Sequence, residues 1–533
     1  MEHSELVLFG LLVAVAGLAV LARLVRVPYP ILLVLGGLAI GLVPGAPEVD
    51  LDPDIVLLIF LPPLLYAAAF FSNLRELRSN AGPIALLAIG LVIATMLAVA
   101  AVSHWVIGLE WKVAFVLGAV VSPTDAVAPA AILRRLGVPR RVITVVEGES
   151  LTNDWTALVA YKFAVAAVVT GSFSLVEAGP KFIATGLGGI AIGLVVGVAI
   201  AAVRRRLDDP PTEITISLLT AYAAYLPAEE VGASGVLAAV TVGVWLGWQA
   251  SELTNAATRL QLVAIWEILQ FLLNAFLFVL IGLQLPVVFE AIDGRSTMEL
   301  AAYGALIAAL VAVVRIVWVF ACMALPLRLF RRTRGAKPLP GWSGAALVSW
   351  SSMRGAVALA AALAIPLNTD AGTPFPERDL IIFLAFCTIL VTLVLQGLTL
   401  PAVINVLGIE EDTQDSDEEL ATRLETAFAA IDRIDELAQQ EWVDEDLANR
   451  MRGLYEYRRR RFRSRVQGEP DEDGMGAEDF EARTDRFRRL RTDVIGAERE
   501  VLRRLRDEGG ITDEVRRKIE YDLDLEETRV AGT

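Results

Sequence analysis

Three apolar stretches of the sequence contain polar side chains that an ordinary membrane helix does not carry. The first reads VLGAVVSPTDAVAPAAIL and contains Thr124 and Asp125 between two prolines, Pro123 and Pro129. Each proline removes a backbone donor and disfavours helix at the residue before it, so the stretch is expected to break in its middle. Freed carbonyls, a hydroxyl and a carboxylate are the hard oxygen ligands that a small cation prefers. We predict a cation site here; the alternative is that Asp125 only caps the break.

The second stretch, within residues 143–170, contains Glu149, Ser150, Asn153 and Asp154. On a helix, Glu149 and Asn153 share one face, while Ser150 and Asp154 share the neighbouring one. Four polar groups on one arc must face the inside of a bundle or a wet cavity. A structural network accounts for an amide and a hydroxyl, but an ionisable group at this depth is costly and marks a functional site. We therefore expect Asp154 to bind an ion or a proton.

The third stretch, GAALVSWSSMRGAVALAAALAI, has Arg354 in its middle. A guanidinium group inside a membrane needs a carboxylate partner, and we expect Glu149, with Asp125 and Asp154 as the alternatives. If Glu149 and Arg354 neutralise each other, Asp125 and Asp154 remain as exchangeable carboxylates. Two further charges within apolar segments, either structural or gating access, are Arg315 and Glu267.

The elements that must position these residues are membrane-spanning helices. The chain is 55% hydrophobic, and its apolar runs are long enough to cross about 30 Å of hydrocarbon. We predict an all-α polytopic membrane protein of about thirteen transmembrane helices, at residues 5–23, 28–43, 54–71, 83–107, 112–133, 143–170, 180–203, 213–228, 234–249, 262–284, 300–326, 343–365 and 379–407. The segments that begin at Asp125 and Gly355 are weakly similar in sequence and lie seven spans apart, which favours inverted repeats.

Basic residues lie in alternate connections, which by the positive-inside rule places the N-terminus outside and the C-terminus in the cytoplasm. The composition changes near residue 409, from apolar runs to closely mixed charges. We predict a transmembrane transport domain at 1–408 and a helical cytoplasmic domain, with a regulatory role, at 409–533. The net charge of −15 argues against nucleic acid as a partner.

Four motifs in this order carry a family resemblance. They are Leu61-Pro62-Pro63, Ser-Pro-Thr-Asp ending at Asp125, Gly-Glu-Ser-Leu-Thr-Asn-Asp ending at Asp154, and Met353-Arg354-Gly355. Over about residues 5–407 the chain resembles the monovalent cation:proton antiporters, in particular the electroneutral sodium/proton exchanger branch in its bacterial form. One departure is Ala67, where many relatives have an acidic residue.

The resemblance implies a homodimer of thirteen-span protomers with crossed discontinuous helices, in which a six-helix core moves to give alternating access. It also implies roles for single residues. The residues expected to bind the cation or proton are Asp154, Asp125, Thr124 and Ser150, with Asp125 and Asp154 as the charged sodium ligands. The residues expected to support the site are Asn153, Glu149 and Arg354.

The expected function is electroneutral exchange of sodium, or lithium or potassium, for protons, with cation and proton competing at Asp154. We therefore expect a transporter in the bacterial inner (plasma) membrane, not an enzyme, and no cofactor. Its expected partners are a second copy, membrane lipid, monovalent cations and a cytoplasmic effector of the tail. Two alternatives stay open from the residues alone: a monovalent cation channel or uniporter, and a proton-coupled solute symporter.

Overall fold

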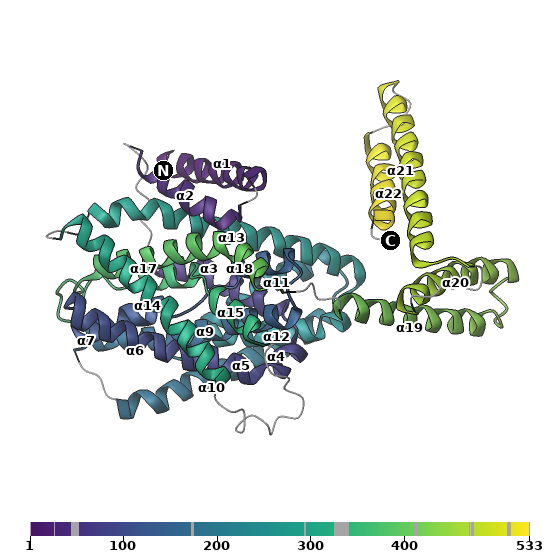
Figure 1. The fold of residues 1–533 in the computed structure, drawn as a ribbon. Helices are drawn as coiled ribbons and strands as arrows, with labels where there is room; N and C mark the ends of the chain where they lie inside the picture. Colours follow the sequence, from purple (N-terminus) through teal and green to yellow (C-terminus); the bar gives the residue numbers. More distant parts are fainter. Residues whose placement is uncertain are drawn as a thin grey trace. The chain divides into compact units, whose positions relative to one another are not determined.

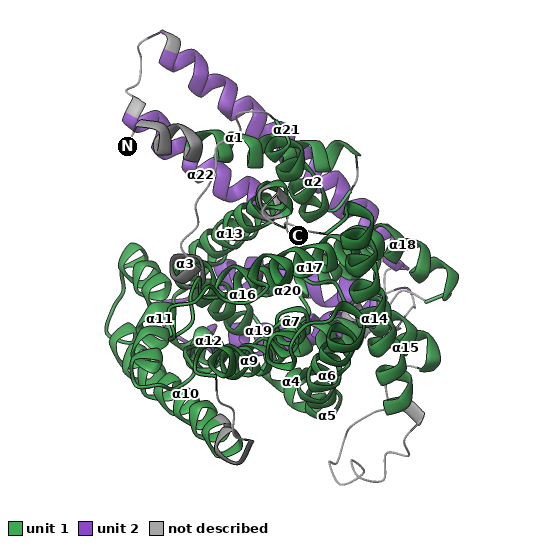
Figure 2. Cartoon of the chain, turned by 90° about the vertical axis from the view of Figure 1, so that its left-hand side faces the viewer, with its two compact units in different colours: residues 1–411 green, residues 412–533 purple. Residues whose placement is uncertain are grey.

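The computed structural model describes residues 2–25, 27–43, 53–171, 175–290, 292, 295–324, 341–409, 414–467, 470, 474–508 and 513–531. Within these residues the fold is helical, and it contains no named strand (Figure 1). The chain divides into two compact units, Met1–Glu411 and Asp412–Thr533 (Figure 2).

Unit 1 begins with three apolar helices and a long helix that contains two π-helical turns. In order these elements are α1 (Glu2–Val25), α2 (Tyr29–Gly41), α3 (Pro53–Phe70), the short α4 (Leu74–Ser79), and the continuous α5 (Ala81–Ala85), η1 (Leu86–Leu91), α6 (Val92–Val102) and η2 (Ser103–Ile107). Asn73 caps α4 by accepting hydrogen bonds from the backbone of Arg75 and Glu76, so the chain turns sharply after α3.

Two segments of unit 1 are each split into a pair of short helices. The first pair is α7 (Trp111–Val121) and α8 (Val127–Arg135), and the second is α15 (Gly341–Trp350) and α16 (Ala356–Leu363). Between them in the chain lie α9 (Arg140–Val169), α10 (Leu175–Arg204), α11 (Pro210–Glu230), α12 (Gly235–Leu253), α13 (Ala256–Glu290) and α14 (Thr297–Ala324). Unit 1 ends with the continuous α17 (Arg378–Val391), η3 (Thr392–Gln396) and α18 (Gly397–Val406).

The apolar helices confirm a membrane protein with many spans. Six helices among the described residues are long and apolar enough to cross a membrane: Ala81–Ile107, Gly179–Arg204, Gly235–Leu253, Ala256–Pro286, Thr297–Cys322 and Arg378–Val406. Four shorter apolar helices are Phe9–Val25, Tyr29–Gly41, Leu58–Phe70 and Trp111–Val121. Helices suit this setting because every backbone hydrogen bond is satisfied within the element.

Close helix contacts in unit 1 depend on glycine. A Cβ atom on Gly37 of α2 would lie 2.2 Å from the carbonyl oxygen of Val279 in α13, and one on Gly282 would lie 2.2 Å from that of Val34. The pair α10 and α12 approaches in the same way through Gly189 and Gly193. These backbones touch, which is how membrane helices pack tightly without a hydrophobic driving force.

The helices that hold the candidate site lie in the middle of unit 1. The long helix α9 packs against α7, α8, α15 and α16, and Figure 2 shows α7, α9 and α16 surrounded by the other helices of the unit. Unit 2 is separate and consists of α19 (Gln414–Leu437), α20 (Glu445–Gln467), α21 (Ala477–Asp507) and α22 (Asp513–Ala531). Within it, α19 packs on α20 and α21 on α22.

Candidate ion-binding site

The two split segments meet at their gaps. Residues 122–126 and 351–355 are not helical, and the backbone N–H of Asp125 donates to the carbonyl oxygen of Met353 at 2.8 Å. Gly355 makes the approach sterically feasible, because a Cβ there would lie 1.7 Å from Oδ2 of Asp125. The motif Met353-Arg354-Gly355 therefore has a structural reason: only glycine fits beside the Asp125 carboxylate.

Asp125 stands at the start of α8. Its Oδ1 accepts a hydrogen bond from the backbone N–H of Val127, the first residue of α8, at 2.8 Å, so the carboxylate satisfies one free donor of the broken helix. The next backbone N–H, that of Ala126, donates to Oγ of Ser150 in α9 at 3.2 Å. Ser150 thus ties the gap to α9 directly beside Asp154.

Thr124, Asn153 and Glu149 form one buried chain of hydrogen bonds. Nδ2 of Asn153 donates to Oγ1 of Thr124 at 2.7 Å, and that hydroxyl donates to Oε1 of Glu149 at 3.1 Å. The sequence places Glu149 and Asn153 on one face of a helix, and in the structure both reach the same threonine. Asn153 therefore holds the gap between α7 and α8 against α9.

The predicted pairing of Glu149 with Arg354 is wrong in this structure. Both carboxylate oxygens of Glu149 bond instead to Arg315 of α14, with Nη2 of Arg315 lying 2.8 Å from Oε2. The two side chains are each 1% exposed. A bidentate fork of this kind satisfies both oxygens at once, so Glu149 needs no second arginine.

Arg354 has a different task at the end of α7. Its Nε donates to the carbonyl oxygen of Val121 at 3.2 Å, and its Nη1 donates to the carbonyl oxygen of Ser352 at 2.7 Å. The last carbonyls of an interrupted helix lack intrahelical partners and carry partial negative charge. The fully buried guanidinium group of Arg354 satisfies one of them and so stabilises the break.

Asp154 is the carboxylate that the network leaves over. It is 6% exposed, and among the described residues burial and the neighbouring Asp125 act on it without a hydrogen-bond donor. Asp125 is close enough to Asp154 for the two carboxylates to act on each other electrostatically. A buried carboxylate without donors calls for a counter-ion or a proton.

The structure thus brings together all seven residues expected at the site. Sequence reasoning missed the role of Arg315, although its place inside an apolar run was the available signal. It also missed Thr392, whose Oγ1 accepts from the backbone N–H of Arg354 at 3.2 Å. Glu267 is exposed on α13 and takes no part in this network.

The position of the family's acidic residue is apolar here. Ala67 is buried in a second hydrophobic cluster with Tyr66, Phe70 and Trp266, separate from the cluster that contains the helices of the site. Among the described residues, no group of three or more His, Cys, Asp or Glu side chains gathers as a metal site.

Comparison with known proteins decides the family. The family model described as the transmembrane sodium/hydrogen exchanger matches residues 10–406. The chain belongs to the sodium/hydrogen exchanger family. Members are antiporters, which are transporters and not enzymes, so the multi-pass membrane assignment and the resemblance seen in the motifs are confirmed.

Relatives extend beyond the membrane unit. An uncharacterized Na(+)/H(+) exchanger of Mycobacterium tuberculosis is 38% identical over 98% of this chain and 96% of its own length. A sodium, potassium, lithium and rubidium/H(+) antiporter of Bacillus pumilus is 34% identical, covering 93% of this chain and 74% of that protein. In fold, this exchanger is similar to the sodium proton antiporter MjNhaP1 from Methanocaldococcus jannaschii, with a TM-score of 0.61 at 21% identity over 76% of this chain and 100% of that one.

Proposed function

We propose that this family member exchanges one sodium ion for one proton by alternating access, with both competing for Asp154. The observation that carries the proposal is the buried Asp154 carboxylate, which has no donor among the described residues and lies beside Asp125 at the crossing of two split helices. A proton neutralises Asp154 directly. A sodium ion does so by binding between the two carboxylates.

The count of charged side chains at the crossing supports a one-to-one exchange. The crossing contains three carboxylates, those of Asp125, Glu149 and Asp154, and two guanidinium groups, those of Arg315 and Arg354, so the negative charges exceed the positive ones by one. The site is therefore one charge short of neutrality when it is empty, and one proton or one sodium ion supplies it. Moving the neutral, loaded site through the membrane is less costly than moving the empty, charged one.

Neutral oxygens complete the proposed cation shell. A hydroxyl has one proton and two lone pairs. The Thr124 hydroxyl gives its proton to Glu149 and accepts from Asn153, which leaves one lone pair for an ion. Ser150 likewise accepts from Ala126 and retains a second lone pair. Sodium is the proposed ion, with lithium or potassium as further substrates, as the name of the Bacillus pumilus relative suggests.

The proposed topology counts each pair of short helices, α7 with α8 and α15 with α16, as one interrupted span. Thirteen spans then result, related as inverted repeats, with the N-terminus outside and the C-terminus in the cytoplasm. We further propose that the transport unit works as a homodimer in the bacterial inner membrane without a resident cofactor. The tail serves as a regulatory domain in this scheme.

Proteoliposomes containing the purified protein and an internal pH dye test this function. An outward sodium gradient should drive proton uptake, and a potassium/valinomycin potential should leave the rate unchanged. A cation channel would move sodium without protons, and a solute symporter would need a third substrate. Sodium flux without coupled proton flux would therefore refute antiport, and a clear voltage dependence would refute the one-to-one ratio.

A further inference from the structure

Unit 2 carries a run of arginines that the transport site does not use. Six of them lie in the second half of α20: Arg458, Arg459, Arg460, Arg461, Arg463 and Arg465. A run this dense places guanidinium groups on several faces of the helix, including the one that packs on α19. Positive charge is therefore gathered beside a helix interface.

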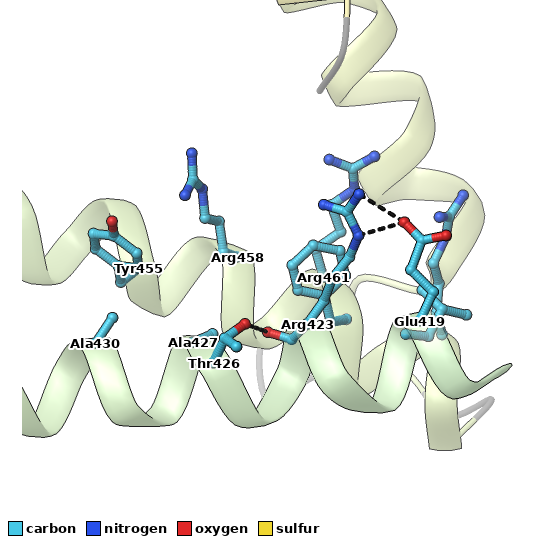
Figure 3. A pocket seen from close by; sticks show the side chains of 11 residues that line it. Glu419, Arg423, Thr426, Ala427, Ala430, Tyr455, Arg458 and Arg461 are labelled. Atoms are coloured by element: carbon cyan, nitrogen blue, oxygen red, sulfur yellow. Dashed lines mark hydrogen bonds and ion pairs between the residues drawn. The ribbon is translucent and has the colours of Figure 1, made fainter. Parts of the chain in front are cut away.

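A pocket of approximately 490 Å³ lies between α19 and α20 (Figure 3). On the α19 side its lining includes the small side chains of Thr426, Ala427 and Ala430, which leave space between the helices. On the α20 side it includes two aromatic rings, those of Tyr455 and Phe462. The volume is in the range of small-molecule sites, which are commonly about 300–1,000 Å³.

The charged lining of this pocket is strongly unbalanced. Its four guanidinium groups, from Arg423, Arg458, Arg461 and Arg465, face one lining carboxylate, that of Glu419. Glu419 is already bound to Arg423, whose Nε lies 2.7 Å from Oε1 (Figure 3). Arg465 forms an ion pair with Glu481 of α21.

Arg458 has no carboxylate among the described residues, and its guanidinium group lies over the Tyr455 ring at 5.1 Å from the centroid. The crowding of positive charge also acts on Arg461. Burial lowers the pKa of its guanidinium group, as do the neighbouring guanidinium groups of Arg465, Arg488 and Arg423. Anionic groups entering the pocket would relieve this repulsion.

We propose that the pocket between α19 and α20 binds a small phosphorylated anion with at least two negative charges. The planar guanidinium fork matches phosphate oxygens in pairs, which is why arginine is enriched in phosphate sites. The aromatic rings hold these cations along the pocket: Arg458 lies over Tyr455, and Arg423 and Arg461 lie over Phe462. A soluble phosphate ester and the phosphate head group of a lipid share this chemistry.

The test uses the full-length protein in phosphatidylcholine nanodiscs, titrated calorimetrically with pyrophosphate and with ADP. Saturable binding is expected, and Arg458→Gln or Arg461→Gln should weaken it by about tenfold or more, since each removes a charge-assisted hydrogen bond. Repeating the pyrophosphate titration in nanodiscs with added phosphatidic acid identifies the source. A lipid ligand competes and weakens pyrophosphate binding, whereas a soluble ligand site is unaffected.

Two further variants make the test specific. Arg459→Gln removes the same charge from the same helix, but Arg459 does not line the pocket, so binding should be unchanged. Glu419→Gln should strengthen binding, because it frees Arg423 and removes a competing carboxylate, and a merely misfolded variant would not gain affinity. The absence of saturable pyrophosphate and ADP binding in phosphatidylcholine nanodiscs would overturn the proposal. An equal loss in Arg459→Gln would also overturn it, by showing diffuse charge attraction.

Discussion

Two buried arginines of unit 1, Arg315 in α14 and Arg354 in the gap between α15 and α16, differ in what they neutralise. Arg315 forms a bidentate ion pair with Glu149, whereas Arg354 donates to backbone carbonyls at the end of α7 and at Ser352. The first cancels a side-chain charge and the second stabilises a broken helix. Asp154 has neither kind of partner among the described residues. Because the two arginines act elsewhere, the Asp154 carboxylate is left for the proposed transported ion.

Asp154→Asn should abolish exchange and leave a folded, membrane-inserted protein. The amide keeps the shape of the side chain but can neither release a proton nor supply the charge that a cation needs. Proteoliposomes with a pH dye measure the exchange, and size-exclusion chromatography in detergent checks the fold. Gradient-driven recovery of the dye at the wild-type rate would remove Asp154 from the mechanism.

Glu149 and Arg315 should behave as an energetic pair. Removing one partner leaves a buried, uncompensated charge, which costs about 3–5 kcal/mol, so Glu149→Gln and Arg315→Gln should each lower the thermal stability in detergent. The double variant should recover part of the loss. A parallel cycle of Glu149→Gln with Arg354→Gln is the matched control and should be closer to additive. The prediction fails if the coupling is found in the second cycle and not in the first.

The pairing shows where sequence reasoning reached its limit at the site. The spacing of Glu149, Ser150, Asn153 and Asp154 was enough to predict that they share an arc of one helix. It could not show which arginine faces that arc, because the rotation of α14 and the path of the gap before Gly355 depend on packing between elements distant in the chain. The period of a helix depends on residues close together in the chain, whereas the arginine that pairs with Glu149 depends on how distant helices pack.

At the scale of elements, the two breaks have different causes. The gap between α7 and α8 contains Pro123 and lies close to Pro129, so the chain itself interrupts the helix. The gap between α15 and α16 contains no proline. It is held open by neighbours: Asp125 donates to Met353, and Arg354 donates through its backbone to Thr392 of η3. The first break could be predicted from residues and the second only from the family resemblance.

Gly355→Ala should disrupt the crossing of the two gaps. Its Cβ would lie 1.7 Å from Oδ2 and 2.5 Å from Cβ of Asp125, and neither the backbone nor the short carboxylate can move away cheaply. Overpacking of this kind typically costs about 1–3 kcal/mol, and here it also displaces a proposed ion ligand. Exchange should fall to near background, with a lower melting temperature in detergent.

The control for this substitution is Gly17→Ala in α1, because a Cβ at Gly17 meets nothing within 4 Å. That variant should transport like the wild type. Wild-type sodium affinity and rate in Gly355→Ala would show that the gaps do not need their close approach.

On the scale of the whole molecule, the helical membrane architecture could be predicted well because apolar runs of sufficient length are a strong signal. The charge pattern changes near residue 409, and the two compact units divide between Glu411 and Asp412. The pocket of unit 2 could not be predicted. It depends on which faces of α19 and α20 meet, and the arginine run alone does not specify this.

Truncation after Glu411 should leave a transport-competent protein with unchanged cation selectivity. Every residue assigned to the ion site lies in unit 1, and α18 ends at Val406. Sodium-, lithium- and potassium-driven proton movement in proteoliposomes measures both properties. If the shortened protein is well folded yet inactive at every pH between about 6 and 9, the tail takes part in the transport cycle itself.

The hydrogen bonds between the two gaps also affect how the rate of sodium transport depends on the direction of transport across the membrane. Asp125 donates to Met353 in the other gap, and Arg354 donates to Val121 at the end of α7. These hydrogen bonds join the four half-helices into one rigid body. A body that moves as one piece presents the same ligand shell to both aqueous phases. Sodium should then have equal Michaelis constants in right-side-out and inside-out vesicles at matched pH, and the sign of net flux should depend on the gradients alone. Unequal Michaelis constants would mean that these hydrogen bonds break and re-form during each transport cycle.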